Sequence, residues 1–153
     1  NLINFKDNTE KIKNICSNCA YSEGIFSNTL DVENCVFKAL STNTIKNLQN
    51  NFSREVPISG KIGNSKYSGY IDLLIENNDH YVIVDYKTDS INKKNSIESK
   101  VEKYSKQLAT YSVLLKQNGI QKDIKAMFLF LDSSKDIEYE IADLSKIETA
   151  VSE

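Results

Sequence analysis

The sequence predicts a mixed α/β domain in which a β-sheet lies between helices. Apolar residues recur at helical spacing near the N-terminus and again between residues 97 and 118. Between these regions, three short segments rich in β-branched and aromatic residues indicate strands. Turn residues separate the three segments closely, which favours antiparallel neighbours and hence a three-stranded meander. With 153 residues, 40% of them hydrophobic and 26% charged, the chain is long enough to bury a core.

The N-terminal part, residues 1–50, is predicted to be helical. The first helix spans Thr9–Ala20, and Asp31 is placed to cap the second, which the polar run Ser41-Thr42-Asn43 interrupts. Each helix carries apolar residues three or four positions apart. These residues are Ile12, Ile15, Cys16 and Cys19 in the first helix, and Val32, Val36, Leu40, Ile45 and Leu48 in the second.

Three strands follow, separated by Gly63-Asn64-Ser65 and Asn77-Asn78-Asp79, which have the composition of turns. Pro57, the only proline, indicates the start or the edge of a strand, because proline cannot donate a ladder hydrogen bond. The predicted strands are Val56–Ile62, Tyr67–Ile75 and Tyr81–Tyr86.

The strongest helix is predicted at Ile97–Asn118, after a polar loop, and Asn118-Gly119 ends it. Its apolar stripe includes Tyr104, Leu108 and Tyr111. Two further strands, at Ala126–Leu131 and Ile137–Ile141, complete the order αα-βββ-α-ββ.

These elements predict a single domain over residues 1–153, with the helical part at 1–50 and the core at 54–131. Because the sequence begins with Asn1 rather than methionine, we expect it to be a fragment of a larger protein.

Composition narrows the class of protein. No apolar run approaches the roughly 20 residues that a membrane span needs, so we expect no membrane partner. Three cysteines, an odd number, argue against a disulfide scaffold and for a protein of the reducing cytoplasm. Cys16-x-x-Cys19 and the distant Cys35 lack a fourth ligand, so packed thiols are favoured over a metal site. The net charge of −2 requires any nucleic-acid binding to rest on a local patch.

The stretch "YVIVDYKT" places Asp85 and Lys87 directly after four residues with the character of a buried strand. Burying a charge is costly unless it is paired or bound to a metal. Asp72 lies in the preceding predicted strand, and neighbouring strands are about 4.8 Å apart, so the two carboxylates can converge on one cation. Lys87 projects from the same face as Asp85, roughly 7 Å further along. We therefore predict a divalent-metal site beside an ammonium group.

The ordered set Gly69-x-x-Asp72, Asp85-Tyr86-Lys87 and Gln107-x-x-x-Tyr111 resembles the PD-(D/E)xK nuclease superfamily. More narrowly, it is similar to the RecB-type nuclease domain at the C-terminus of the AddA and RecB helicase–nucleases. The resemblance covers about residues 54–131 closely and the N-terminal helices loosely. It implies a restriction-endonuclease-like core with a central mixed β-sheet flanked by helices.

The resemblance also implies roles for individual residues. Asp72, Asp85 and the backbone carbonyl of Tyr86 would bind Mg²⁺ or Mn²⁺, and Lys87 would orient or activate the attacking water. Gln107 and Tyr111 are four residues apart on one helix face, which in relatives supports the site and touches the DNA strand. Glu55 matches an acid that assists near the active site in many relatives.

One departure from the RecB pattern is that Phe37 stands where a metal-binding histidine is expected on an N-terminal helix. The only histidine, His80, is predicted to be a solvated turn residue. The alternative to an active nuclease is therefore a weakened or inactive DNA-binding or docking module with the same fold.

The expected substrate is DNA, as a single strand or a duplex end, within a helicase–nuclease of double-strand break repair. The resemblance implies a helicase domain in the same parent chain and a possible partner subunit. A restriction-enzyme-like or phage exonuclease would share the site, whereas an iron–sulfur nuclease is disfavoured because no cysteine cluster follows the last helix. Several lysines near the long helix are candidates for contacts to DNA phosphates. They are Lys93, Lys94, Lys100, Lys103 and Lys106.

Overall fold

The computed structural model describes residues 8–48, 51–88, 97–131 and 138–152. The chain forms two compact units, Asn1–Asn47 and Leu48–Glu153. None of the described helices is both long enough and apolar enough to cross a membrane.

The first unit is helical, as its sequence predicts. The side chain of Asn8 caps the first helix by accepting a hydrogen bond from the amide of Lys11 at 2.9 Å. The predicted interruption after the second helix is confirmed, because Thr42 ends that helix and its hydroxyl caps a short third one by accepting from Ile45 N at 3.2 Å. The elements are α1 (Thr9–Ser22), the 3₁₀ turn η1 (Phe26–Asn28), α2 (Thr29–Ser41) and α3 (Asn43–Lys46).

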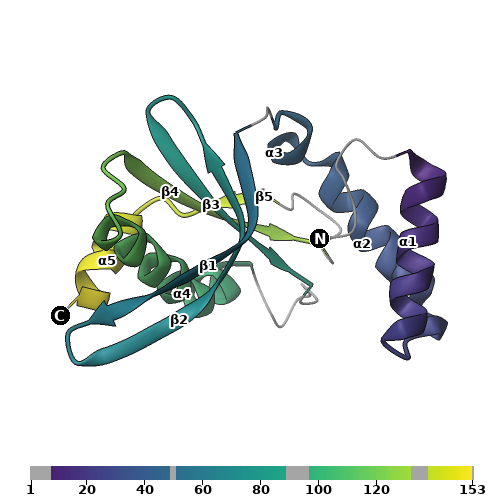
Figure 1. Ribbon diagram of the computed structural model, residues 1–153, viewed down its shortest axis with the longest axis horizontal. Helices are drawn as coiled ribbons and strands as arrows, with labels where there is room; N and C mark the ends of the chain where they lie inside the picture. The colour runs from purple at the N-terminus through teal and green to yellow at the C-terminus, as the bar shows by residue number, and fades with distance from the viewer. Residues whose placement is uncertain (1–7, 49–50, 89–96, 132–137, 153) are drawn as a thin grey trace. The chain divides into compact units, whose positions relative to one another are not determined.

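The second unit contains a five-stranded mixed sheet in the order β1-β2-β3-β4-β5, packed against two helices (Figure 1). The predicted antiparallel meander is confirmed in β1, β2 and β3, and β4 runs parallel to β3 after a crossover through α4. The elements are β1 (Phe52–Ile62), β2 (Ser65–Glu76), β3 (His80–Lys87), α4 (Ile97–Gln117), β4 (Asp123–Phe130), β5 (Glu138–Glu140) and α5 (Leu144–Ser152).

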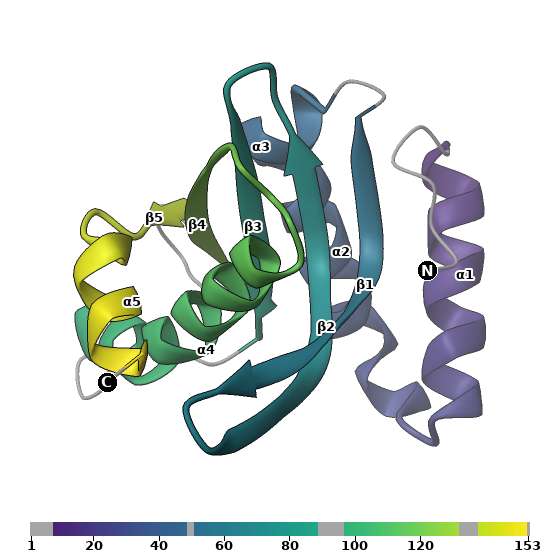
Figure 2. The same ribbon diagram turned by 60° about the vertical axis from the view of Figure 1, so that its left-hand side comes forward.

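Helix α4 provides much of the core on one face of the sheet (Figure 2). Its fully buried residues Leu108, Ala109 and Leu114 pack in one cluster with apolar residues of every strand from β1 to β4, including Ile83 and Phe128. Strands β3 and β4 are almost continuously apolar because both lie in the interior of the sheet.

Strand β2 leaves β3 partway along its length. The pairing of β2 with β3 covers only Leu73–Glu76, whereas β2 stays paired with β1 from Ser65 to Ile75. After Val84, the described part of β3 continues to pair with β4, whereas its pairing with β2 has ended. The sheet is therefore open between β2 and β3 next to Asp72 and Asp85.

Pro57 lies within β1, which is an edge strand, so the edge position that this proline indicates is confirmed. One element differs from the sequence expectations. Helix α5 was not predicted, although Leu144, Ile147 and Val151 recur at helical spacing and pack on the core.

Candidate active site

Asp72 and Asp85 lie where β2 and β3 separate. Leu73 of β2 is opposite Val84 of β3 in the last pair of this ladder, so the two aspartates occupy the next position on each strand. The Oδ2 atom of Asp72 accepts a hydrogen bond from the backbone N–H of Tyr86 at 2.9 Å. The Asp72 carboxylate thus reaches across the opening to β3, and the structure brings the two predicted acids to one place.

Lys87 is held against Asp85 at the end of β3. Its Nζ atom is 2.7 Å from Oδ2 of Asp85, and the two side chains retain only 16% and 8% of their exposure. The same ammonium lies 4.5 Å from the ring centroid of Tyr104 in α4. Lys87 is therefore fixed by one ion pair and one cation–π contact, which makes its burial tolerable.

Burial shifts the pKa of two neighbouring groups. The pKa of Asp72 is raised, chiefly because burial disfavours its charged form, and the charge of Glu55 adds to this. The hydrogen bond from Tyr86 N–H and the charge of Lys87 act in the opposite direction. Burial, followed by the charge of Asp72, raises the pKa of the Tyr86 phenol to about 12, so this phenol stays protonated at neutral pH.

Glu55 marks a local distortion opposite Asp72. The β1–β2 ladder pairs Arg54 with Leu73 and Val56 with Ile71, but the pair between them is missing. Glu55 has φ = 51°, which is uncommon for a residue other than glycine. Such backbone strain gathers at functional sites, and here it lies beside a proposed metal ligand.

The helix motif packs directly on the strand motif. The Nε2 atom of Gln107 donates a hydrogen bond to the hydroxyl of Tyr111 at 3.1 Å. A Cβ atom at Gly69 would overlap that hydroxyl, and it would lie 3.1 and 3.2 Å from two ring carbons of Tyr111. Glycine at position 69 is therefore required by the close approach of Tyr111, three residues before Asp72.

A surface groove of about 520 Å³ runs past this contact. Residues of β2, α4 and α5 line it, and Lys106, Gln107 and Tyr111 contribute from α4.

The other candidate lysines fall in different places. Lys93 and Lys94 lie outside the described residues. Lys100 is half-buried in the first turns of α4, and Lys106 is exposed. Lys103 donates a hydrogen bond to the hydroxyl of Tyr104 at 3.2 Å, and its ammonium lies 4.8 Å from the ring centroid.

Two ammonium groups, from Lys87 and Lys103, therefore contact the Tyr104 ring. From its place in the apolar stripe, Tyr104 is predicted only as a core residue. The available signal was its position seven residues before Tyr111 on the same stripe.

Arg54 is also a neighbour that the motifs do not indicate. Its charge lowers the pKa of the Tyr86 phenol, although burial outweighs this effect. The residue lies on β1, next to the distorted Glu55.

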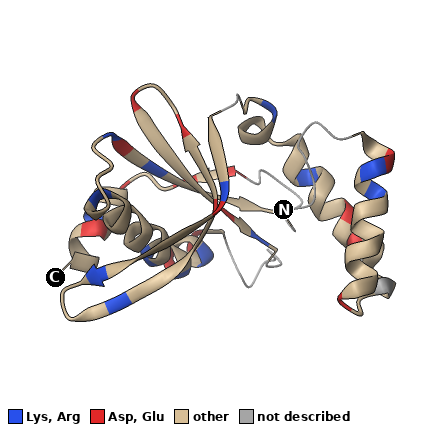
Figure 3. Cartoon of the chain, viewed as in Figure 1, with Lys and Arg blue, Asp and Glu red and all other residues tan. Residues whose placement is uncertain are grey.

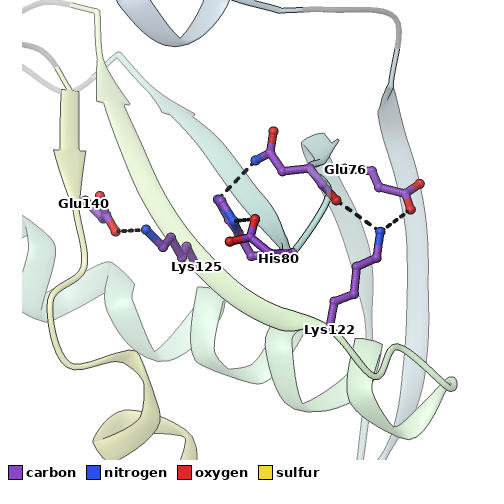
Figure 4. Close-up of polar contacts among 7 residues, drawn as sticks. Glu76, His80, Lys122, Lys125 and Glu140 are labelled. Atoms are coloured by element: carbon purple, nitrogen blue, oxygen red, sulfur yellow. Dashed lines mark hydrogen bonds and ion pairs between the residues drawn. The ribbon is translucent and has the colours of Figure 1, made fainter.

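His80 lies at the opposite end of β3 from Asp85 (Figure 4). Its Nδ1 atom is 2.7 Å from Oδ1 of Asp79, and its Nε2 atom is 3.1 Å from the side-chain nitrogen Nδ2 of Asn77. The imidazole retains 23% of its exposure, so it is more buried than the predicted solvated turn residue. The paired turn residues hold it there and explain the difference.

Lys122 completes the polar cluster at this end of the sheet (Figure 4). It donates hydrogen bonds to Glu76 at 2.8 Å and to the backbone oxygen of Asn77 at 3.0 Å. These bonds tie the β2–β3 turn to the segment that enters β4, which is a structural role.

Phe37 is half-buried in α2 of the first unit. The three cysteines form no disulfide within the described parts of the chain, and Cys16 is buried. Among the described residues, no group of three or more histidine, cysteine or acidic side chains is arranged to hold a metal ion.

The oxygen donors at the strand opening fit Mg²⁺ or Mn²⁺. Two carboxylates and a backbone carbonyl are hard ligands, and Mg²⁺ usually retains several waters, so a larger set of acids is not required. Burial raises the pKa of Asp72, because the charged carboxylate loses solvation there. A divalent cation would compensate its charge.

Comparisons with known proteins are informative at the level of family and fold. The family model of the PD-(D/E)XK nuclease superfamily matches residues 31–153. A solved structure from Eubacterium rectale, named "Putative exonuclease", is similar with a TM-score of 0.58 and 14% sequence identity. The match covers 96% of this chain and 65% of that chain, so the present chain spans less than two thirds of that protein. No curated protein matches the sequence.

Proposed function

This chain belongs to the PD-(D/E)XK nuclease superfamily, and we propose that the opening between β2 and β3 hydrolyses phosphodiester bonds in DNA. The observation that carries the proposal is the grouping of Asp72, Asp85 and Lys87 at this opening. Asp72 accepts a hydrogen bond from β3, and Lys87 lies 2.7 Å from Asp85 in a largely buried ion pair. This arrangement concentrates two carboxylates and one ammonium on a rim that backbone pairing leaves open.

We assign Asp72, Asp85 and the Tyr86 carbonyl as the metal ligands. Mg²⁺ or Mn²⁺ held by these residues would supply Lewis-acid chemistry, by polarising the phosphoryl group and lowering the pKa of water. The hydrogen bond from Tyr86 N–H fixes the Asp72 carboxylate, so this ligand is oriented before the metal arrives.

Lys87 positions the reacting groups in this proposal. Its contact with the Tyr104 ring, at 4.5 Å from the ring centroid, would keep the ammonium near the opening. From there it can orient the attacking water and offset negative charge on the scissile phosphate. Gln107 and Tyr111 act indirectly, because their packing on Gly69 sets the position of β2 and hence of Asp72.

The proposed context is an AddA- or RecB-like helicase–nuclease that acts as an exonuclease in double-strand break repair. The motif set Gly69-x-x-Asp72, Asp85-Tyr86-Lys87 and Gln107-x-x-x-Tyr111 supports this assignment. The whole of residues 1–153 would then be one nuclease domain of a larger chain, with a helicase domain and a possible partner subunit as further components.

The experiment is degradation of end-labelled single-stranded DNA by the purified chain in Mn²⁺. Asp85→Asn and Lys87→Met should each abolish cleavage, since they remove a metal ligand and the positioned ammonium. Asp79→Asn and Lys125→Met are matched controls, because these side chains are at least half exposed and lie away from the opening. Equal cleavage by the parent and by both site variants would refute the proposal, provided that circular dichroism shows a retained fold.

A second candidate function is a nuclease fold that binds DNA but has lost cleavage. Phe37 at the position expected for a metal-binding histidine favours this alternative. Titration calorimetry with Mn²⁺ separates the two functions. Binding that Asp72→Asn and Asp85→Asn eliminate supports the nuclease, and absence of heat at millimolar Mn²⁺ supports the DNA-binding module.

A further inference from the structure

The groove that passes the contact between Tyr111 and Gly69 lies on the α4 side of the sheet. Tyr67 of β2 lines this groove and is directly opposite Gly60 of β1 in the ladder. A Cβ atom at Gly60 would lie 2.6 Å from a side-chain carbon of Leu114 in α4. Because residues directly opposite each other share one face of a sheet, Tyr67 faces α4 as well. We call this feature the β2–α4 groove.

The proposed active site lies on the same side of the sheet. The ammonium of Lys87 contacts the ring of Tyr104 in α4 and the carboxylate of Asp85. Gln107 lines the groove and is three residues from Tyr104, which is about 4.5 Å along the helix axis. The α4 wall of the groove therefore leads to Lys87 within one helical turn.

The β2 wall of the groove leads to the same place. Gly69 packs against Tyr111 at the groove, and Asp72 follows three residues later, roughly 10 Å along the strand. The Asp72 carboxylate reaches β3 through the hydrogen bond from Tyr86 N–H. Both walls of the β2–α4 groove therefore lead to the opening between β2 and β3.

The lining of the groove suits a flat ring with polar edges. Tyr67 and Tyr111 contribute aromatic side chains from two different elements, and Tyr67 keeps 37% of its surface exposed. One N–H of Gln107 donates to the Tyr111 hydroxyl, so the amide oxygen and the second N–H can reach a ligand. The exposed Lys106 adds a positive charge, and no acidic side chain is among the described residues that line the groove. Residues of α5 complete the lining, and they are Ile147, Ala150 and Val151.

We propose that the β2–α4 groove binds an unpaired nucleobase of the DNA strand that enters the active site. The base would stack on Tyr67, and its edge would form a hydrogen bond with the amide of Gln107. Lys106 would bind a neighbouring phosphate. Tyr67 and the residues of α5 lie outside the motif set, so the resemblance does not imply this site. The inference rests on the proposed function, because it names the form of DNA that the same site receives.

Size and charge favour a nucleobase over other occupants. The groove volume of about 520 Å³ falls within the roughly 300–1,000 Å³ of sites that bind small ligands. Basic positions lie on both elements that form its walls, α4 and the β1–β2 hairpin, which favours a polyanion (Figure 3). A base within a duplex is already paired and stacked, so only an unpaired base can enter the groove.

The test measures binding without cleavage, by fluorescence anisotropy of a labelled oligothymidylate with the full chain in EDTA. Tyr67→Ala should weaken binding roughly tenfold, whereas Tyr67→Phe should retain it because the ring remains. Tyr70→Ala is the matched control, since it removes an exposed tyrosine of the same strand from the opposite face. If circular dichroism shows that Tyr67→Ala is unfolded, Tyr67→Leu keeps an apolar side chain opposite Gly60 and should show the same loss of binding.

An abasic oligomer of equal length separates contacts to bases from contacts to phosphates. Tyr67→Ala should leave its affinity unchanged, because this oligomer carries phosphates but no bases. Lys106→Gln should reduce the slope of log K against log salt concentration by about 0.7 for both oligomers, as expected for one lost contact to a single-strand phosphate. Lys125→Gln is the charge-matched control on an exposed residue of β4.

These outcomes decide the inference separately from the proposed function. Unchanged binding of oligothymidylate by Tyr67→Ala, an equal loss in Tyr70→Ala, or no binding by the parent chain would overturn it even if the chain cleaves DNA in Mn²⁺. An equal loss for the abasic oligomer or for a blunt duplex would also overturn it, because neither offers an unpaired base. An unchanged salt slope in Lys106→Gln would overturn the phosphate contact. Selective loss of oligothymidylate binding supports the inference, and absence of cleavage in Mn²⁺ would then refute only the catalytic proposal.

Discussion

Replacing Gly69 by alanine tests whether strand β2 and helix α4 position the active site together. The new Cβ would overlap the hydroxyl of Tyr111 and would lie 3.1 and 3.2 Å from two of its ring carbons. Overpacking of this kind costs about 1–3 kcal/mol, and alanine recovers about 0.5–1 kcal/mol relative to glycine within a strand. We therefore expect Gly69→Ala to lower the free energy of unfolding by about 1–2 kcal/mol.

A double-mutant cycle with Tyr111→Phe makes this prediction specific. Removing the hydroxyl deletes the worst overlap, but it also deletes the hydrogen bond from Gln107, which is worth about 0.5–1.5 kcal/mol. In the Tyr111→Phe background, Gly69→Ala should cost close to nothing, because the remaining contacts are relieved by shifts of a few tenths of an ångström. The coupling free energy should be about 1–2 kcal/mol.

Urea unfolding measures the cycle. With a slope near 2 kcal/mol per molar urea, Gly69→Ala should lower the midpoint by about 0.5–1 M at an unchanged slope. Ser68→Ala is the matched control, since it alters the adjacent exposed position and should leave the midpoint nearly unchanged. DNA cleavage by Gly69→Ala should also fall, because the displaced strand carries Asp72. A fully stable Gly69→Ala protein, or additive effects in the cycle, would refute the close-packing argument.

Three further predictions concern charged residues. Lys87→Met should lower the free energy of unfolding by about 3 kcal/mol, because it leaves Asp85 buried without its cation, and Asp85→Asn in the same chain should restore much of this in urea unfolding. Asp72→Asn should raise the melting temperature of the metal-free protein at pH 7. Burial raises the folded pKa of Asp72 above its unfolded value near 4. The ionised Asp72 therefore destabilises the folded protein, and this destabilisation is absent below the unfolded pKa and grows as pH rises through the folded pKa. In Mn²⁺ the parent should have the higher melting temperature of the two, because only the parent keeps the proposed metal ligand. Without metal, a lower melting temperature for Asp72→Asn than for the parent would count against the argument. The hydrogen bond from Lys122 lowers the pKa of Glu76, so its stabilisation is present above the unfolded pKa and is lost as pH falls through the folded pKa. Glu76→Gln should flatten this part of the curve of melting temperature against pH, and an unchanged curve would argue against the contribution.

The nuclease superfamily could be predicted from the sequence because its motifs are local. An apolar run that ends in Asp85 and Lys87 indicates a site from the sequence alone, because burying a charge is costly unless the charge is paired or bound. The superfamily prediction is confirmed by the family match, whereas the narrower RecB-type assignment stays a prediction. The spacing of Gln107 and Tyr111 likewise predicts one helix face, and the structure places their side chains in contact.

The sequence by itself determined the strand and helix order of the core, because hydrophobic period and turn residues act over a few neighbouring positions. Only the tertiary structure decided where β2 leaves β3, because ladder pairing depends on residues distant in the sequence. The same holds for the Tyr104 ring against Lys87 and for the Tyr111 hydroxyl against Gly69, since both contacts arise only when α4 packs across the sheet. The reason is that local patterns fix which face of an element is apolar, while the identity of the partner on that face is set by packing of the whole unit.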